Sequence, residues 1–215
     1  MPTLKFLFDG PRSADVLLAL AHGAGAPMDS PFMETVAGGL AARGLRVARF
    51  EFPYMARRRR EGGRRPPDRQ PALLAHWHAV HAELRRGHAG RLLIGGKSMG
   101  GRMATMVADE LGAGGVVCLS YPFHPAGRPE KPRVAHLAAL KTPTLILQGE
   151  RDALGNRDDV AGYTLSSAIE VIWLGDGDHD LKPRKKSSRT HEQNLAQAIA
   201  AIADFAVRPT LSEID

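Results

Sequence analysis

Ser98 lies between two glycines in the segment Gly96-Lys-Ser-Met-Gly100, where a short apolar run gives way to a helix-like pattern. This G-x-S-x-G arrangement is typical of a nucleophile elbow, in which a strand turns sharply into a helix and lifts a serine hydroxyl above a sheet. Side chains at positions 96 and 100 would collide with neighbouring backbone, which explains the glycines. We expect strained backbone at Ser98 and interpret its hydroxyl as a candidate nucleophile for acyl carbonyls.

A serine hydroxyl needs a base, and the base needs an acid that orients it. His179 lies in the segment Gly175-Asp-Gly-Asp-His-Asp180, directly after an apolar run. Asp152 ends the segment Gly149-Glu-Arg-Asp152, which follows another apolar run. His179 would take the proton of Ser98 and return it to a leaving group, while Asp152 would hold the imidazole in the productive tautomer. The sequence therefore predicts Ser98, Asp152 and His179 as a catalytic triad.

Four other acidic residues compete with Asp152 for this role: Glu150, Asp176, Asp178 and Asp180. The three aspartates are too close in sequence to His179 to orient its ring. Glu150 points to the opposite side of its strand from its neighbour in sequence, because side chains alternate along an extended segment. We therefore expect Asp152 to be the partner of His179.

Attack on a carbonyl creates an oxyanion that needs backbone amide donors. The small-residue segment His22-Gly-Ala-Gly25 follows another apolar run and would let amides approach a ligand closely. We expect the amides of Ala24 and Met99 to bind the oxyanion, and the loss of one such donor typically raises the barrier by ~3 kcal/mol. Four residues are further expected to line the substrate site: His22, Gly23, Lys97 and Tyr121.

The elements that must position these residues alternate along the chain. Strands are predicted at residues 4–8, 16–21, 45–50, 91–95, 115–120, 144–148 and 169–174. Helices are predicted at residues 31–43, 71–86, 101–111, 158–166 and 190–207. This alternation indicates a doubly wound α/β fold, with helices on both faces of a mostly parallel sheet. Because functional groups gather at the carboxyl ends of such strands, the serine, the acid, the histidine and the small-residue segment are expected at one edge.

The segments at 22–25, 96–101, 149–152 and 177–179 together resemble the α/β-hydrolase superfamily, and in particular its compact dienelactone-hydrolase-like branch. The resemblance runs over nearly the whole chain. The chain length predicts one domain over residues 1–215, and the segment 209–215 is predicted to be a frayed tail. The resemblance implies a hydrolase of esters, thioesters or lactones without a cofactor. Dienelactone hydrolases use a cysteine nucleophile where this chain has Ser98, so their substrate is not carried over. The short insertion after Tyr121 predicts an open site without a large lid.

The net charge of +6 is concentrated in two basic segments, residues 57–69 and 182–189. Residues 57–68 are predicted to form a long polar loop, since they include Gly62-Gly63 and Pro66-Pro67. Both segments follow strand ends, so one hypothesis is that they rim the site and steer an anionic acyl substrate; the other is a solvated surface. Nucleic-acid binding is disfavoured because no aromatic residue lies between Met55 and Gln70.

Other interpretations of these residues are weaker. A P-loop ending at Lys97-Ser98 would need glycine where Arg91 stands, and a dinucleotide fingerprint fails at Met28. The spacing of His76, His78 and His81 does not favour a metal site. Cys118 lies in an apolar run and is expected in a buried strand.

No apolar stretch suits a membrane span or a secretory signal, so we expect a cytoplasmic protein. A non-catalytic binding or scaffold protein with this fold is the alternative function, and the oligomeric state stays open.

Overall fold

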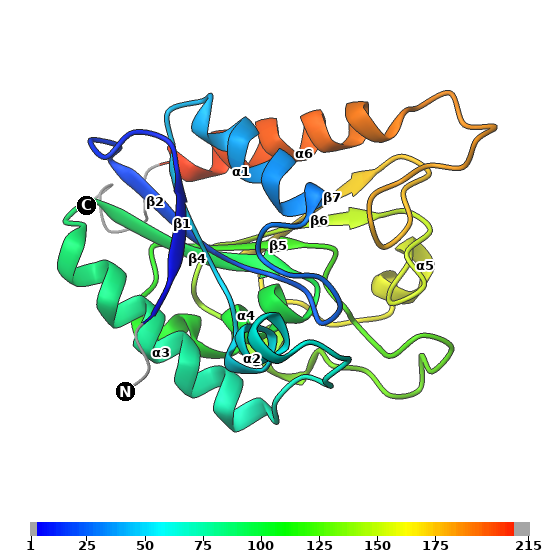
Figure 1. The fold of residues 1–215 in the computed structure, drawn as a ribbon. Helices are drawn as coiled ribbons and strands as arrows, with labels where there is room; N and C mark the ends of the chain where they lie inside the picture. Colours follow the sequence, from blue (N-terminus) through cyan, green and yellow to red (C-terminus); the bar gives the residue numbers. More distant parts are fainter. Residues whose placement is uncertain (1–3, 209–215) are drawn as a thin grey trace.

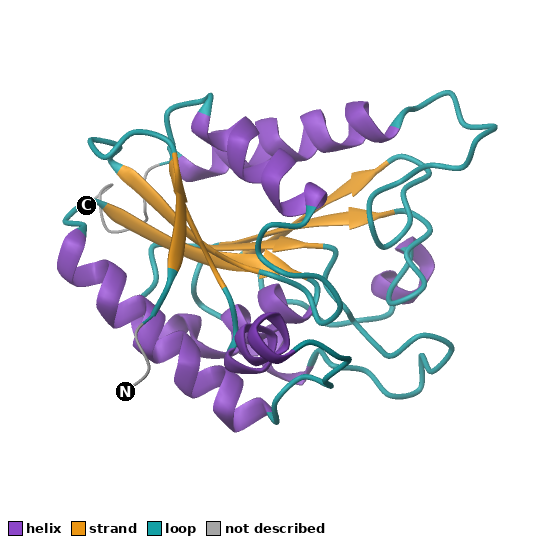
Figure 2. Cartoon of the chain, in the orientation of Figure 1, coloured by secondary structure: helices purple, strands orange, loops and turns teal. Residues whose placement is uncertain are grey.

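The computed structural model describes residues 4–208 as a seven-stranded sheet with helices on both faces (Figures 1 and 2). The strand order is β1-β3-β2-β4-β5-β6-β7, and β1 alone runs antiparallel, beside β3. The strands are β1 (Phe6–Asp9), β2 (Val16–Ala21), β3 (Arg46–Phe50), β4 (Arg91–Lys97), β5 (Val116–Leu119), β6 (Thr144–Gly149) and β7 (Ile169–Leu174). The predicted doubly wound, mostly parallel fold is confirmed.

Helices α1 and α6 cover one face of the sheet, while α2, α3 and α4 lie on the other (Figure 1). The helices are α1 (Pro31–Ala41), α2 (Pro53–Glu61), α3 (Gln70–Gly87), α4 (Met99–Leu111), α5 (Arg157–Ala161) and α6 (His191–Ala206), with a 3-10 helix η1 (Ala135–Ala139). Strand β2 shows why the apolar runs are continuous. Leu18 and Leu20 pack under α1 and α6, whereas Leu17 and Ala19 pack on the opposite side, so both faces of the strand are buried.

The predicted polar loop at residues 57–68 is wrong in its first part, because residues 57–61 belong to helix α2, while residues 62–68 do form a loop. Pro53 occupies the first turn, where its missing N–H costs nothing, and arginine is a good helix former. Arg59 forms hydrogen-bonded ion pairs with Glu51 at 2.6 Å and Asp29 at 2.7 Å. Both acids lie outside the helix, so the pairing that stabilises α2 is tertiary and leaves no periodic signal in the sequence.

The ends of the other helices follow from local chemistry. Thr190 and Gln193 form a capping box at the start of α6. Helix α5 is shorter than the predicted 158–166, and Asn156 caps it together with Asp159. The predicted frayed tail at 209–215 lies outside the described residues. Among residues 4–208, no helix has the length and apolar character that crossing a bilayer requires.

Candidate active site

Ser98 sits at the junction of β4 and α4 with a backbone that few residues other than glycine adopt, at φ 51° and ψ −114°. The strain predicted at the elbow is therefore present. A Cβ atom at Gly96 would lie 2.4 Å from the carbonyl oxygen of Ala21, and one at Gly100 would lie 2.6 Å from that of His22. Both glycines are required because β2 packs against the turn, and this close packing presents the serine at the sheet edge.

The structure brings the three predicted triad residues into one hydrogen-bonded chain. His179 Nε2 lies 2.9 Å from Ser98 Oγ, and His179 Nδ1 lies 2.8 Å from Asp152 Oδ2. An ionised carboxylate only accepts, so Nδ1 carries the proton and Nε2 is left to accept from the serine hydroxyl. Asp152 is fully buried, whereas the side chain of His179 is 28% exposed. This arrangement can deprotonate Ser98 while the histidine remains within reach of a substrate.

The carboxylate of Asp152 is held by two donors besides the histidine. The backbone amide of Leu154 donates to Oδ1 at 2.8 Å, and the side-chain amide of Gln148 donates to Oδ2 at 2.9 Å. Gln148 is fully buried at the end of β6, and it also donates to the carbonyls of Tyr121 and Gly155. Sequence reasoning missed Gln148. Its signal was a polar residue ending an otherwise apolar strand.

The competing acids have other partners. Glu150 accepts the backbone amide of Asp176 and pairs with Arg157 at 2.9 Å; these two interactions lower the pKa of Glu150. Asp176 pairs with Arg151 at 2.8 Å and with Arg184. Asp178 accepts backbone amides of its own turn. Within residues 4–208, Asp152 is the acidic side chain that contacts the imidazole of His179.

The predicted oxyanion donors lie on both sides of the serine. Met99 is the first residue of α4, so its amide has no partner within the helix. Ala24 is exposed, and its amide has no acceptor within the described part of the chain. A Cβ atom at Gly23 would lie 3.8 Å from the Cβ of Ser98, which shows how closely this loop approaches the nucleophile. Both amides are thus unpaired and near Ser98.

Helix α2 supports the same loop from its other side. The Tyr54 hydroxyl donates to the carbonyl of Ala24 at 3.0 Å, and Arg58 donates to the carbonyl of Gly25 at 3.1 Å. Because these interactions use carbonyl groups, they leave the amides of the loop available. Helix α2, whose residues 57–61 were predicted to lie in a loop, therefore shapes the site by holding the loop at 22–25.

Three of the four residues expected to line the substrate site are instead buried supports. His22 is fully buried; its Nε2 accepts the amide of Phe52 at 3.1 Å, and burial lowers the pKa of the imidazole. Tyr121 is fully buried and donates to the carbonyl of Arg133 at 2.9 Å. His22 thus binds backbone just after β3, and Tyr121 binds backbone just before η1, so both side chains support neighbouring segments. Gly23 packs against Ser98 as expected.

Lys97 points away from solvent, and it holds the histidine loop. Its ammonium group donates to the carbonyl of His179 and lies 3.2 Å from Asp180 Oδ1 and 5.2 Å from the ring centre of Phe32. Burial lowers the pKa of this ammonium group. Lys97 therefore contacts the backbone of His179. Its ammonium group is directed at the histidine loop and not, as expected, at the substrate site.

Most arginines of the two basic segments are paired with acids. Arg57 pairs with Asp68, Arg65 with Glu61, and Arg184 with Asp176. A paired guanidinium contributes little to a long-range field. Within residues 4–208, Arg58, Arg64 and Arg69 have no acidic partner, so the steering of an anionic substrate by these segments stays a prediction.

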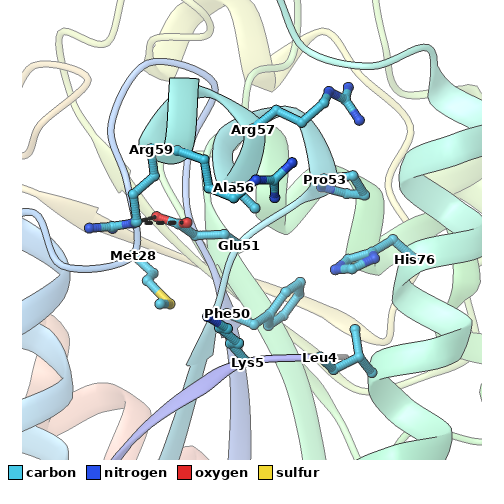
Figure 3. A pocket seen from close by; sticks show the side chains of 11 residues that line it. Leu4, Lys5, Met28, Phe50, Glu51, Pro53, Ala56, Arg57, Arg59 and His76 are labelled. Atoms are coloured by element: carbon cyan, nitrogen blue, oxygen red, sulfur yellow. Dashed lines mark hydrogen bonds and ion pairs between the residues drawn. The ribbon is translucent and has the colours of Figure 1, made fainter. Parts of the chain in front are cut away.

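Figure 3 shows a cavity of about 290 Å³ beneath α2, with His76 of α3 and Phe50 of β3 in its wall. Its lining contains neither a triad residue nor a residue of the loop at 22–25.

Within residues 4–208, no three His, Cys, Asp or Glu side chains are grouped to hold a metal ion. Cys118 is buried in β5 as predicted, and burial raises the pKa of its thiol.

Known structures share this arrangement of elements. A serine hydrolase without a lid from Xanthomonas campestris is 18% identical, with 96% of this chain and 91% of that chain covered and a TM-score of 0.71. Est1E from Butyrivibrio proteoclasticus, solved with ferulic acid bound, is 15% identical with 95% of each chain covered and a TM-score of 0.71. A thioesterase domain from the curacin biosynthetic pathway is 16% identical, with 96% and 99% covered and a TM-score of 0.62.

At these identities the structural matches establish the fold. The family comes from the sequence, because a model of the alpha/beta hydrolase domain matches residues 14–207 and so spans every strand from β2 to β7. The predicted resemblance to the superfamily, and the compact form without a large lid, are thereby confirmed. This chain belongs to the alpha/beta hydrolase domain family.

Proposed function

We propose that this protein is a serine hydrolase of small, accessible acyl substrates that acts through an acyl-enzyme. The observation that carries the proposal is the hydrogen-bonded chain from Asp152 through His179 to Ser98, with the amides of Ala24 and Met99 unpaired beside the serine. The family and the names of its structural neighbours, which include an esterase and a thioesterase domain, support acyl transfer. The short connection after β5 supports an open site.

In the first half of the reaction, Ser98 Oγ attacks the acyl carbonyl while His179 Nε2 takes its proton. The tetrahedral oxyanion accepts hydrogen bonds from the amides of Met99 and Ala24. His179 then donates the proton to the leaving alcohol or thiol, which leaves an ester on Ser98. Buried Asp152 stabilises the imidazolium in the transition state.

In the second half, water enters from the open side and His179 removes its proton as the oxygen attacks the acyl-enzyme. Collapse of the second tetrahedral intermediate releases the carboxylic acid and returns the proton from His179 to Ser98. All of these proton transfers use one imidazole nitrogen, so the geometry of the His179 loop is the requirement that governs both halves.

A fluorophosphonate probe tests the proposal most directly, because it reacts with an activated serine irrespective of the natural substrate. We expect covalent labelling of the wild-type protein, none of Ser98→Ala, and unchanged labelling of Ser188→Ala, which removes an exposed serine. Short-chain 4-nitrophenyl esters, thioesters and lactones then separate the bond types, with hydrolysis by Ser98→Ala lower by at least about 10³-fold. A folded wild-type protein that is neither labelled nor active would favour the binding or scaffold alternative.

A further inference from the structure

Two partly buried arginines near the elbow lack an acidic partner: Arg102 in α4 and Arg133 before η1. We refer to them as the arginine pair. The Nε of Arg102 is buried without a hydrogen-bond partner, and its Nη2 reaches the amide oxygen of Gln70 at 3.4 Å. The side chain of Arg133 forms no hydrogen bond and no ion pair within residues 4–208. This differs sharply from Arg57, Arg59 and Arg184, each of which is paired.

A hydrogen-bonded cluster holds both arginines in place. Thr105 Oγ1 donates to the carbonyl of Arg102 at 2.8 Å and lies 2.9 Å from His136 Nε2. The Tyr121 hydroxyl donates to the carbonyl of Arg133 at 2.9 Å and lies 3.5 Å from the same nitrogen. The backbones of the two arginines are thus joined through one imidazole. Their position is set by buried side chains and not by the flexibility of a surface loop.

Burial and mutual repulsion disfavour the positively charged forms of the residues in this cluster. Burial and the nearby charge of Arg102 lower the pKa of Arg133, and burial together with Arg102 lowers the pKa of His136 to about 4. Two guanidinium groups that lack a carboxylate, next to an imidazole that stays neutral, form a positive region within the fold. A guanidinium fork matches the oxygens of a carboxylate or a phosphate, so a bound anion would offset this cost.

Arg102 lies one helical turn from the nucleophile, and the cluster around His136 joins the backbone of Arg133 to it. The amide of Arg102 donates to the carbonyl of Ser98 at 3.0 Å, so the two residues are one helical turn apart. Gln70, which Arg102 contacts, begins α3 at the same edge of the sheet. One turn rises about 5.4 Å, which four or five bonds of a flexible chain can span.

We propose that the arginine pair binds an anionic group, a carboxylate or a phosphate monoester, on the acyl substrate of Ser98. The proposal rests on the proposed serine hydrolase function and narrows its substrate class to esters or thioesters with a second, negatively charged end. It places the anion-binding charge on two arginines outside the basic segments at residues 57–69 and 182–189.

Paired substrates test this directly: 4-nitrophenyl hydrogen glutarate, whose acyl chain ends in a carboxylate, and neutral 4-nitrophenyl butyrate. We expect wild-type kcat/KM to favour the glutarate ester by about 10-fold or more, less so in high salt. Arg102→Met and Arg133→Met keep the apolar stem. Each should lower kcat/KM for the glutarate ester by about 10- to 100-fold and leave the butyrate ester within twofold. Arg128→Met removes an exposed arginine of the same connection and should change neither substrate.

Equal wild-type rates for the two esters, or an equal loss on both substrates in the Met variants, would overturn the proposal while leaving the serine hydrolase intact. A binding measurement distinguishes failure of the anion site from failure of the serine hydrolase function. In Ser98→Ala, which cannot turn over, glutarate and monobutyl phosphate are titrated by calorimetry, and the comparison between them also distinguishes a carboxylate site from a phosphate site. We expect binding of at least one, lost in Ser98→Ala/Arg133→Met and kept in Ser98→Ala/Arg128→Met. Absence of binding by both anions would reject the arginine pair as an anion site even if neither ester were hydrolysed.

Discussion

Two histidine–aspartate pairs lie at the carboxyl edge of the sheet, and one of them contacts a serine hydroxyl. In the first, His179 contacts Asp152 through Nδ1 and leaves Nε2 to Ser98. In the second, His124 contacts Asp159 through Nε2 at 3.1 Å, and its Nδ1 lies 2.8 Å from the carbonyl of Pro125. Both nitrogens of His124 therefore face acceptors, and neither is available to a serine.

Burial is also reversed between the two pairs. Asp152 is fully buried and the His179 side chain is 28% exposed, whereas the His124 side chain is 4% exposed and Asp159 is 25% exposed. The exposed member of the first pair is the one that must meet substrate. The second pair instead joins the start of α5 to the connection after β5. A short contact between histidine and aspartate is thus no indication of catalysis until the remaining nitrogen has been assigned.

The largest effect is expected from matched substitutions of the two aspartates. Asp152→Asn should lower kcat/KM by about 10⁴-fold, because the amide no longer selects the tautomer in which His179 Nε2 accepts a proton. Asp159→Asn should leave kcat/KM within about twofold and lower the free energy of unfolding slightly through the cap of α5. Ester hydrolysis and urea unfolding measure the two quantities. Similar losses of activity in both variants would contradict the distinction between the pairs.

A smaller effect is expected at Gln148, which supports the first pair and has no counterpart in the second. Gln148→Met keeps the side-chain length but removes a donor to Asp152 and the side-chain donor to the carbonyl of Gly155. The carbonyl of Tyr121 keeps the amide of Phe123 as its donor. We expect the free energy of unfolding to fall by about 1–3 kcal/mol. We also expect kcat to fall about 10-fold with little change in KM, as for loss of transition-state stabilisation. A stability loss with unchanged kcat would limit Gln148 to a structural role.

The smallest effect concerns a third histidine, His136, whose pKa is lowered to about 4 by burial and by Arg102. Its neutral form is favoured in the folded chain, while the unfolded chain takes up a proton near the ordinary value of about 6.5. The stability it contributes is therefore complete above pH 6.5 and is lost as the pH falls toward 4. His136→Gln should flatten this part of the curve of unfolding free energy against pH.

Urea unfolding midpoints between pH 7 and 4 measure that slope. His78→Gln, which removes a partly exposed imidazole 3.6 Å from Glu110, is the control for loss of a histidine outside this cluster. Buried His22, whose pKa is also lowered, should keep part of the acid sensitivity in the His136 variant. An unchanged slope in His136→Gln would mean that the cluster around the arginine pair tolerates a protonated imidazole.

Much of the fold was predictable because its signals are local. Strands β2 and β7 begin and end where the apolar runs do, at Val16–Ala21 and Ile169–Leu174. The side chains that form the triad were predictable for the same reason, since each follows a strand end in a parallel sheet and such ends share an edge. Helix α2 was not predictable, since Arg59 finds its partners in Glu51 and Asp29, outside the helix.

The amino-acid sequence by itself determined the alternation of strands and helices, the elbow at Ser98 and the acid and base that could serve it, because those features depend on neighbours a few residues away. Tertiary structure alone decided that Lys97 supports the His179 loop, that His22 and Tyr121 are buried, and which arginines keep their charge unpaired. Ion pairing and burial depend on residues distant in the chain that folding brings within a few ångströms. A count of arginines along the sequence therefore pointed to residues 57–69, where the packed structure pairs Arg57, Arg59 and Arg65 with acids; it gives no acid to the partly buried Arg102 and Arg133.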